Sequence, residues 1–156
     1  MEKVELSMKG DLYMNRINLI TLGVRDMKTS IKFYRDGLGF ETSETKDEAD
    51  VVFFRNGGTR LALFPITELA KDIDENNPPV KSGFSGITLA YNGKSVEEVD
   101  EMMKKAEAAG GKIVKPAQKV FWGGYSGYFT DPDGYYWEVA YGEMWQFDEN
   151  DMLVIE

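Results

Sequence analysis

The chain contains one structural pattern twice, and this repeat restricts its possible folds more than any other feature. In the first copy, residues 17–24 predict a strand, and Asp26 is suited to the N-cap of the helical pattern that follows. Residues 51–54 and 60–64 predict two short strands. Asn56-Gly57-Gly58 between them is typical of a hairpin turn. One helix on one small sheet cannot enclose a core alone, so two such modules must combine.

The second copy follows the same order. Residues 86–91 predict a strand, Ser95 and Glu98 form a capping box for a helix, and further strands are predicted within residues 112–141. We therefore expect an α+β fold of two βαβββ modules in a single domain, residues 1–156. Its predicted parts are module one (about 15–70), a linker (about 72–82), module two (about 83–142) and a tail (143–156).

The chain has neither cysteine nor histidine. Disulfides, thiol nucleophiles, cysteine–histidine zinc sites and histidine general bases are therefore excluded. The groups that remain for catalysis are carboxylate, lysine, tyrosine, serine and threonine, and the chain is also compatible with no catalysis at all.

The formal net charge is −9, with 27 acidic against 18 basic residues. Such a charge repels phosphate backbones, so we expect no nucleic-acid partner. No apolar run approaches the length of about 18 residues that spans a bilayer, so we expect no membrane partner either. Residues 1–10 lack the continuous apolar stretch of a signal peptide, and the expected location is the cytoplasm.

Alternation along the predicted strands separates two faces. One face holds large apolar residues and is expected to pack beneath the helices: Ile20, Leu22, Val24, Leu61, Leu63, Ile87, Leu89, Tyr91, Trp137, Val139 and Tyr141. The other face is small or semi-polar: Leu19, Thr21, Gly23, Arg60, Ala62, Phe64, Gly86, Thr88, Ala90, Tyr136, Glu138 and Ala140. If the sheet curves, this second face forms a concave small-molecule site. The alternatives are a solvated face or one covered by a partner subunit.

Several motifs in a fixed order resemble a known family. They are the segment from Thr21 to Asp26, Phe33-Tyr34, Leu38-Gly39-Phe40, and Asp131-Pro132-Asp133-Gly134 followed by the segment from Trp137 to Ala140. Together they resemble the vicinal oxygen chelate superfamily of glyoxalases, bleomycin resistance proteins and extradiol dioxygenases. The resemblance implies an eight-stranded, U-shaped mixed sheet around a cavity, and it implies a homodimer.

Metal-dependent members of that superfamily hold an ion with four ligands on the central strands. The resemblance places these positions at or near Leu19, Ala62, Gly86 and Glu138, so Glu138 alone keeps a ligand type. Hard divalent ions need about six oxygen ligands, and softer ions prefer imidazole or thiolate. We therefore predict no metal site and no other cofactor.

Glu138 is the single catalytic candidate, as a general base, while Arg60 is its expected partner. The alternative is a structural remnant without a role. The aromatic residues suit stacking on a planar molecule, although ordinary core packing would use them equally well. The predicted ligand-binding set is Thr21, Phe54, Arg60, Thr88, Trp122, Tyr125, Tyr136 and Glu138.

Three functions compete. The first is a metal-free protein that sequesters a small molecule in the manner of bleomycin resistance proteins. The second is a glyoxalase-like lyase or isomerase that relies on Glu138 as base, with Arg60 or a tyrosine stabilising negative charge. The third is a non-catalytic interaction domain whose concave face is filled by a partner chain or by the apolar tail. The sequence favours the first, and it leaves open whether the protein is an enzyme.

Overall fold

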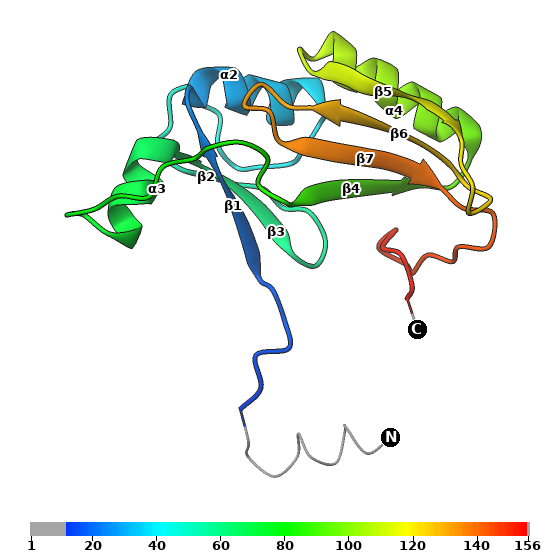
Figure 1. Ribbon diagram of the computed structural model, residues 1–156, viewed down its shortest axis with the longest axis horizontal. Helices are drawn as coiled ribbons and strands as arrows, with labels where there is room; N and C mark the ends of the chain where they lie inside the picture. The colour runs from blue at the N-terminus through cyan, green and yellow to red at the C-terminus, as the bar shows by residue number, and fades with distance from the viewer. Residues whose placement is uncertain (1–11, 156) are drawn as a thin grey trace.

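The computed structural model describes residues 12–155 (Figure 1). Residues 1–11 and Glu156 lie outside the described part, so the expectation for residues 1–10 is not addressed by the structure. The elements are β1 (Leu19–Val24), α2 (Met27–Ile31), the π-helix η1 (Lys32–Gly37), β2 (Val52–Phe53), β3 (Arg60–Pro65), α3 (Ile66–Ile73), β4 (Thr88–Gly93), α4 (Val96–Ala108), β5 (Lys112–Lys119), β6 (Tyr125–Thr130) and β7 (Tyr136–Tyr141).

The strands form two sheets with the same connectivity. Sheet A has the order β1-β3-β2 and sheet B the order β4-β7-β6-β5. In each module the first strand pairs in parallel with the last, and the remaining pairs are antiparallel. The predicted α+β class and the module repeat are confirmed, and the sheets do not close into a barrel.

Seven strands are present in the described chain, where eight were expected. The position of the eighth, between η1 and β2, is a loop rich in charged residues. Arg35 holds this loop, because its guanidinium contacts the Asp47 carboxylate at 2.6 Å and donates to the Lys46 carbonyl at 3.1 Å. The charged loop is therefore tied to η1 by side chains and adds no ladder to sheet A.

The helix of module one begins as predicted. Asp26 accepts a hydrogen bond from the Lys28 amide at 3.1 Å and from the Thr29 hydroxyl at 2.9 Å, which caps the first turn. The second half widens into the π-helix η1, where the Leu38 amide donates to the Phe33 carbonyl. The sequence predicted one continuous helix here, and apolar spacing does not distinguish the two hydrogen-bond patterns.

The helix of module two, α4, also agrees with its prediction. The Ser95 hydroxyl accepts from the Glu98 amide at 3.0 Å, which is half of a capping box. Val99, Met103 and Ala106 form its buried stripe. Within residues 12–155, no helix combines the length and the apolar character that crossing a bilayer requires.

One core joins the two modules. It lies between the helices α2, η1 and α4 and the faces of both sheets that they cover (Figure 1). Phe33 and Tyr34 from module one pack against Phe129 and Trp137 from module two. The rings of Phe129 and Trp137 are stacked at 6.1 Å. An aromatic contact between the modules is therefore part of the buried core.

The turn Asp131-Pro132-Asp133-Gly134 fastens this contact. The Gly134 amide donates to the Asp131 carbonyl at 3.0 Å, as the sequence predicted for a turn with proline in second position. The Asp133 carboxylate accepts from the Arg25 amide at 2.9 Å and from the Ser30 hydroxyl at 3.0 Å. Residues that contributed to the family resemblance therefore serve as the joint between the modules.

Helix α3 was not expected. It follows β3 directly and occupies the end of module one, up to where the sequence placed the linker. Its residues include Glu68, Lys71 and Asp72, and none of its side chains is fully buried. Ile66 at its start covers Gly23 of β1, where a side chain would meet Ile66 at 3.0 Å.

Candidate functional site

The candidate site is the open face, defined as the side of both sheets turned away from α2, η1 and α4 (Figure 1). The strand registers assign its residues. Sheet A contributes Leu19, Thr21, Gly23, Phe53, Arg60, Ala62 and Phe64, and sheet B contributes Thr88, Ala90, Asn92, Ser126, Tyr128, Thr130, Tyr136, Glu138 and Ala140. Most of these side chains are small or semi-polar, as the sequence predicted.

The division into faces holds for the central strands. On the helix side, the core contains Leu22, Val24, Leu61, Leu63, Trp137 and Val139. Two residues predicted for this face are exposed instead of packed. Ile87 precedes β4 and is 63% exposed, and Tyr91 is 41% exposed. Both lie on or beside β4, the edge strand of sheet B, which is less covered by α4 than β6 and β7 are.

Glu138 lies on β7 directly opposite Tyr128 of β6. The Tyr128 hydroxyl donates a hydrogen bond of 3.1 Å to the Glu138 carboxylate. Burial and the Glu138 charge raise the pKa of Tyr128 above its ordinary value, so this hydroxyl stays protonated at neutral pH and remains a donor. The pair presents one carboxylate and one phenol to the open face.

Arg60 does not pair with Glu138 within the described chain. It stands at the first position of β3 opposite Leu19, on the other sheet. There it lines a hollow of about 710 Å³ together with Arg16, Ile17 and Leu19. The two groups that the sequence paired therefore belong to separate halves of the open face.

The structure separates the predicted aromatic residues. Tyr136 lies on the open face, where the Phe84 ring meets it edge-on at 5.6 Å. Phe54 is instead fully buried in the core beside Tyr34, because residues 52 and 54 point to the helix side of β2. Its neighbour Phe53 faces outward on the open face and is 52% exposed.

Tyr125 is also on the helix side, where its hydroxyl donates to the Asp100 carboxylate of α4 at 2.7 Å. Trp122 lies in the loop before β6 and stacks on Trp145 at 5.5 Å. Of the eight predicted ligand-binding residues, the open face therefore holds Thr21, Arg60, Thr88, Tyr136 and Glu138.

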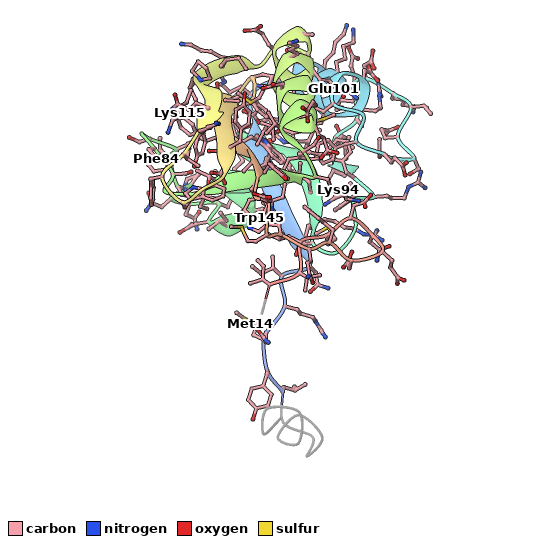
Figure 2. All side chains as sticks on the ribbon, turned by 90° about the vertical axis from the view of Figure 1, so that its right-hand side faces the viewer. Met14, Phe84, Lys94, Glu101, Lys115 and Trp145 are labelled. Atoms are coloured by element: carbon pink, nitrogen blue, oxygen red, sulfur yellow. The ribbon has the colours of Figure 1, made fainter. Side chains whose placement is uncertain are left out.

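The tail folds back onto this chain. Phe147 and Leu153 form an isolated bridge, and the Lys94 ammonium pairs with the Asp151 carboxylate. Met152 reaches the β2–β3 loop of module one. Its methyl carbon lies so close to Gly58 that a Cβ at this glycine would be 3.6 Å away. Figure 2 looks onto this end of the molecule and labels Trp145 and Lys94. The tail therefore spans from module two to module one at one end of the open face.

The strand registers also align the two modules. Leu19 pairs with Arg60 and Thr88 pairs with Tyr136, which makes Thr88 the counterpart of Leu19. Gly86, where the sequence placed the third ligand position, lies two residues before β4. The same register makes Glu138 the counterpart of Ala62.

By strand register, the set of equivalent positions in the two modules is Leu19, Ala62, Thr88 and Glu138. It offers one carboxylate and one hydroxyl, which does not fit a divalent ion. Across residues 12–155 there is no group of three or more acidic residues placed to hold a metal. The residues present do not fit the metal that the fold family implies.

Tyr128 as the partner of Glu138 is a relationship that the sequence reasoning missed. A connection of the four predicted turn residues, 131–134, would have paired Tyr128 with Trp137. In the structure the Asp131 amide donates to the Tyr135 carbonyl at 3.0 Å, and this connection of one more residue places Tyr128 opposite Glu138. Phe53 was missed because the short strand β2 was assigned the wrong outward residue.

Comparison with known proteins gives consistent results. The model of the family described as Glyoxalase/Bleomycin resistance protein/Dioxygenase superfamily matches residues 16–139. The uncharacterized protein YraH of Bacillus subtilis is 30% identical over 116 residues, which cover 73% of this chain and 88% of that protein.

Solved structures share the fold. A glyoxalase-related enzyme from Fulvimarina pelagi is 30% identical, with a TM-score of 0.81 over 91% of this chain and 99% of that one. Lactoylglutathione lyase from Agrobacterium tumefaciens is 27% identical, with a TM-score of 0.62 over 87% of this chain and 100% of that one.

Proposed function

Because this chain belongs to the Glyoxalase/Bleomycin resistance protein/Dioxygenase superfamily, we propose that it binds a small molecule on the open face without a metal. The mode is sequestration of the kind that bleomycin resistance proteins perform. The observation that carries this proposal is the donor set at the four central positions, where Leu19, Ala62 and Thr88 accompany Glu138. Such a set binds organic groups better than it binds divalent ions.

The ligand class is a planar molecule with a cationic group. Glu138 supplies a carboxylate that is held by Tyr128, and Tyr136 with Phe84 supplies aromatic faces beside it. A net charge of −9 raises the local concentration of cations around the protein. A cation therefore meets both long-range attraction and a positioned partner.

The proposed assembly is a homodimer in the cytoplasm. Glu138 and Arg60 lie on separate sheets, and the open face exposes the apolar side chains of Leu19 and Phe53. Residues 12–18 extend away from the domain and expose Leu12 and Met14 (Figure 1). A second copy would cover these groups and complete the binding site.

Calorimetric titration with bleomycin tests the proposal, because this compound joins a planar aromatic unit to a cationic group. We expect wild type to bind in buffer containing EDTA, and Glu138→Gln to bind about tenfold more weakly because one ionic hydrogen bond is lost. Glu101→Gln on the outer side of α4 (Figure 2) is the matched control and should bind like wild type. Equal affinity of all three proteins would contradict a role for Glu138.

A lyase or isomerase activity is the second candidate, and the Glu138–Tyr128 pair is the observation that favours it. The carboxylate would remove a proton from a carbon acid, and the Tyr128 hydroxyl would donate a hydrogen bond to the oxyanion that forms. The test is turnover of the hemithioacetal of methylglyoxal and glutathione, with and without added nickel, zinc, cobalt or manganese. Turnover lost in Glu138→Gln would establish this activity, and metal-dependent turnover would overturn the metal-free proposal.

A further inference from the structure

A second cleft lies outside the open face, between α3 and the linker. Its volume is about 760 Å³, within the range of ordinary small-molecule sites. Figure 1 shows α3 and the chain that follows it at the edge of module one, away from the C-terminal tail. None of the residues proposed for the open-face ligand lines this cleft.

The walls of the cleft are apolar. Ile66 and Ala70, one helical turn apart on α3, form one wall, and Pro78, Pro79 and Val80 form the other. No α3 side chain is fully buried, and Val80 is 88% exposed. The two prolines restrict the backbone of their wall, so little ordering is needed when a ligand enters.

Three cationic side chains lie at the rim of the cleft. Arg25, Lys71 and Lys81 line it together with one carboxylate, that of Asp133. Asp133 already accepts from Arg25 at 3.1 Å, and its side chain is only 4% exposed. Lys71 also pairs with Glu68 of α3 at 3.7 Å, where both side chains are more than half exposed. Lys81 is therefore the rim cation beyond these two ion pairs, and the exposed Lys71 ammonium is open to a further anionic partner.

The position of Lys81 is fixed by two contacts. Its ammonium donates to the Asp133 carbonyl at 3.0 Å and lies 4.0 Å from the centre of the Tyr135 ring. Lys71 stands on the opposite side of the cleft, on α3. Two ammonium groups from separate elements thus flank the same apolar space.

We propose that this cleft binds an anionic amphiphile, a carboxylate with an apolar body such as a medium-chain fatty acid. The apolar body lies between α3 and the proline segment, and the carboxylate lies between Lys71 and Lys81. This site is distinct from the open face and takes the opposite charge.

Calorimetric titration with decanoate tests the proposal, with decanol as the uncharged comparison. We expect decanoate to bind wild type more tightly than decanol does. Lys71→Gln/Lys81→Gln should bind decanoate about tenfold more weakly, whereas Lys104→Gln on α4 should bind it like wild type. Ala70→Trp, which fills the cleft, should remove binding, and its circular dichroism spectrum reports whether α3 remains folded.

The Glu138→Gln variant separates this cleft from the open face. It should bind decanoate like wild type, so the two proposals can fail independently. No decanoate binding, equal binding of decanol, or equal loss in Lys104→Gln would overturn the anionic-amphiphile site. Binding that is lost in Glu138→Gln and kept in Ala70→Trp would place the ligand on the open face and would also overturn it.

Discussion

The Tyr34 hydroxyl donates a hydrogen bond of 2.6 Å to the Asp131 carboxylate and accepts one of 3.1 Å from the Trp137 indole. Tyr34 belongs to module one, and its two partners belong to module two. The other oxygen of Asp131 accepts from the amides of Asp133 and Tyr135, each at 2.9 Å. This buried network fixes how the two modules meet and therefore how the two halves of the open face are arranged.

Tyr34→Phe should destabilise the protein by about 1–3 kcal/mol, because it leaves a buried carboxylate oxygen and a buried indole N–H without partners. Urea denaturation followed by circular dichroism measures the change. Tyr125→Phe is the matched control. It removes one hydroxyl that bonds a carboxylate at a less buried place, and the loss should be smaller. A larger loss in the control would contradict the importance of the network.

Asp131 should also govern part of the response to pH. Burial raises the pKa of Asp131 above its ordinary value of 3.8, so the folded state binds more protons there than the unfolded state. Its contribution to stability is therefore full below about pH 3.8 and is lost as the pH rises through the raised pKa. Asp26, Asp36 and Asp47 act in the opposite sense, because their hydrogen bonds lower their pKa.

Asp131→Asn tests this sign. In wild type, the folded state takes up a proton at Asp131 on acidification, which stabilises the fold against the loss from the other carboxylates. Asp131→Asn lacks this group, so its free energy of unfolding should fall more steeply than that of wild type between about pH 7 and pH 4. Urea denaturation at several pH values provides the two slopes. A gap between the proteins that narrows on acidification would show that the shift of the Asp131 pKa has the opposite sign.

Gly37→Ala should destabilise the protein by about 1–3 kcal/mol, because the added Cβ would collide with Ala109 after α4. Gly57→Ala is the control, since a Cβ there meets nothing closer than 3.8 Å and its φ is not positive. Thermal unfolding of both variants measures the difference. Equal melting temperatures would contradict the close approach of the two helical segments.

Trp145→Ala should loosen the tail without unfolding the domain, because the stack on Trp122 is one of its main contacts with module two. Hydrogen–deuterium exchange should become faster in residues 143–155 and stay unchanged in α4. Phe121→Ala is the control, because that neighbouring ring is fully exposed. Unchanged exchange in the tail of Trp145→Ala would show that other contacts, such as Lys94 with Asp151, hold the tail alone.

The sequence predicted the features that depend on residues close together in the chain. The caps at Asp26 and Ser95, the turn at Asp131 and the alternation of the central strands follow from short spacings, and the structure has all of them. The missing strand and α3 depend on tertiary contacts, such as Arg35 with Asp47 and Ile66 with Gly23, which lie beyond any local pattern.

The same distinction applies to the candidate site. Thr21, Thr88 and Glu138 were placed on the open face by alternation alone. Phe54 and Tyr125 were misplaced because aromatic residues suit a core and a binding site equally well, and only packing distinguishes them. The expected contact of Arg60 with Glu138 is absent because the two residues lie on separate sheets. The alternation of residues along each strand does not tell how two sheets are arranged relative to each other.

Native mass spectrometry of the EDTA-dialysed protein tests metal-free binding most directly, with nickel or manganese and bleomycin offered in separate samples. We predict a bleomycin adduct without a metal ion and no stoichiometric metal adduct, because the positions equivalent to Glu138 and Thr88 in module one hold Ala62 and Leu19, which offer no ligand atom. One tightly held metal ion per chain, lost in Glu138→Gln, would contradict metal-free binding.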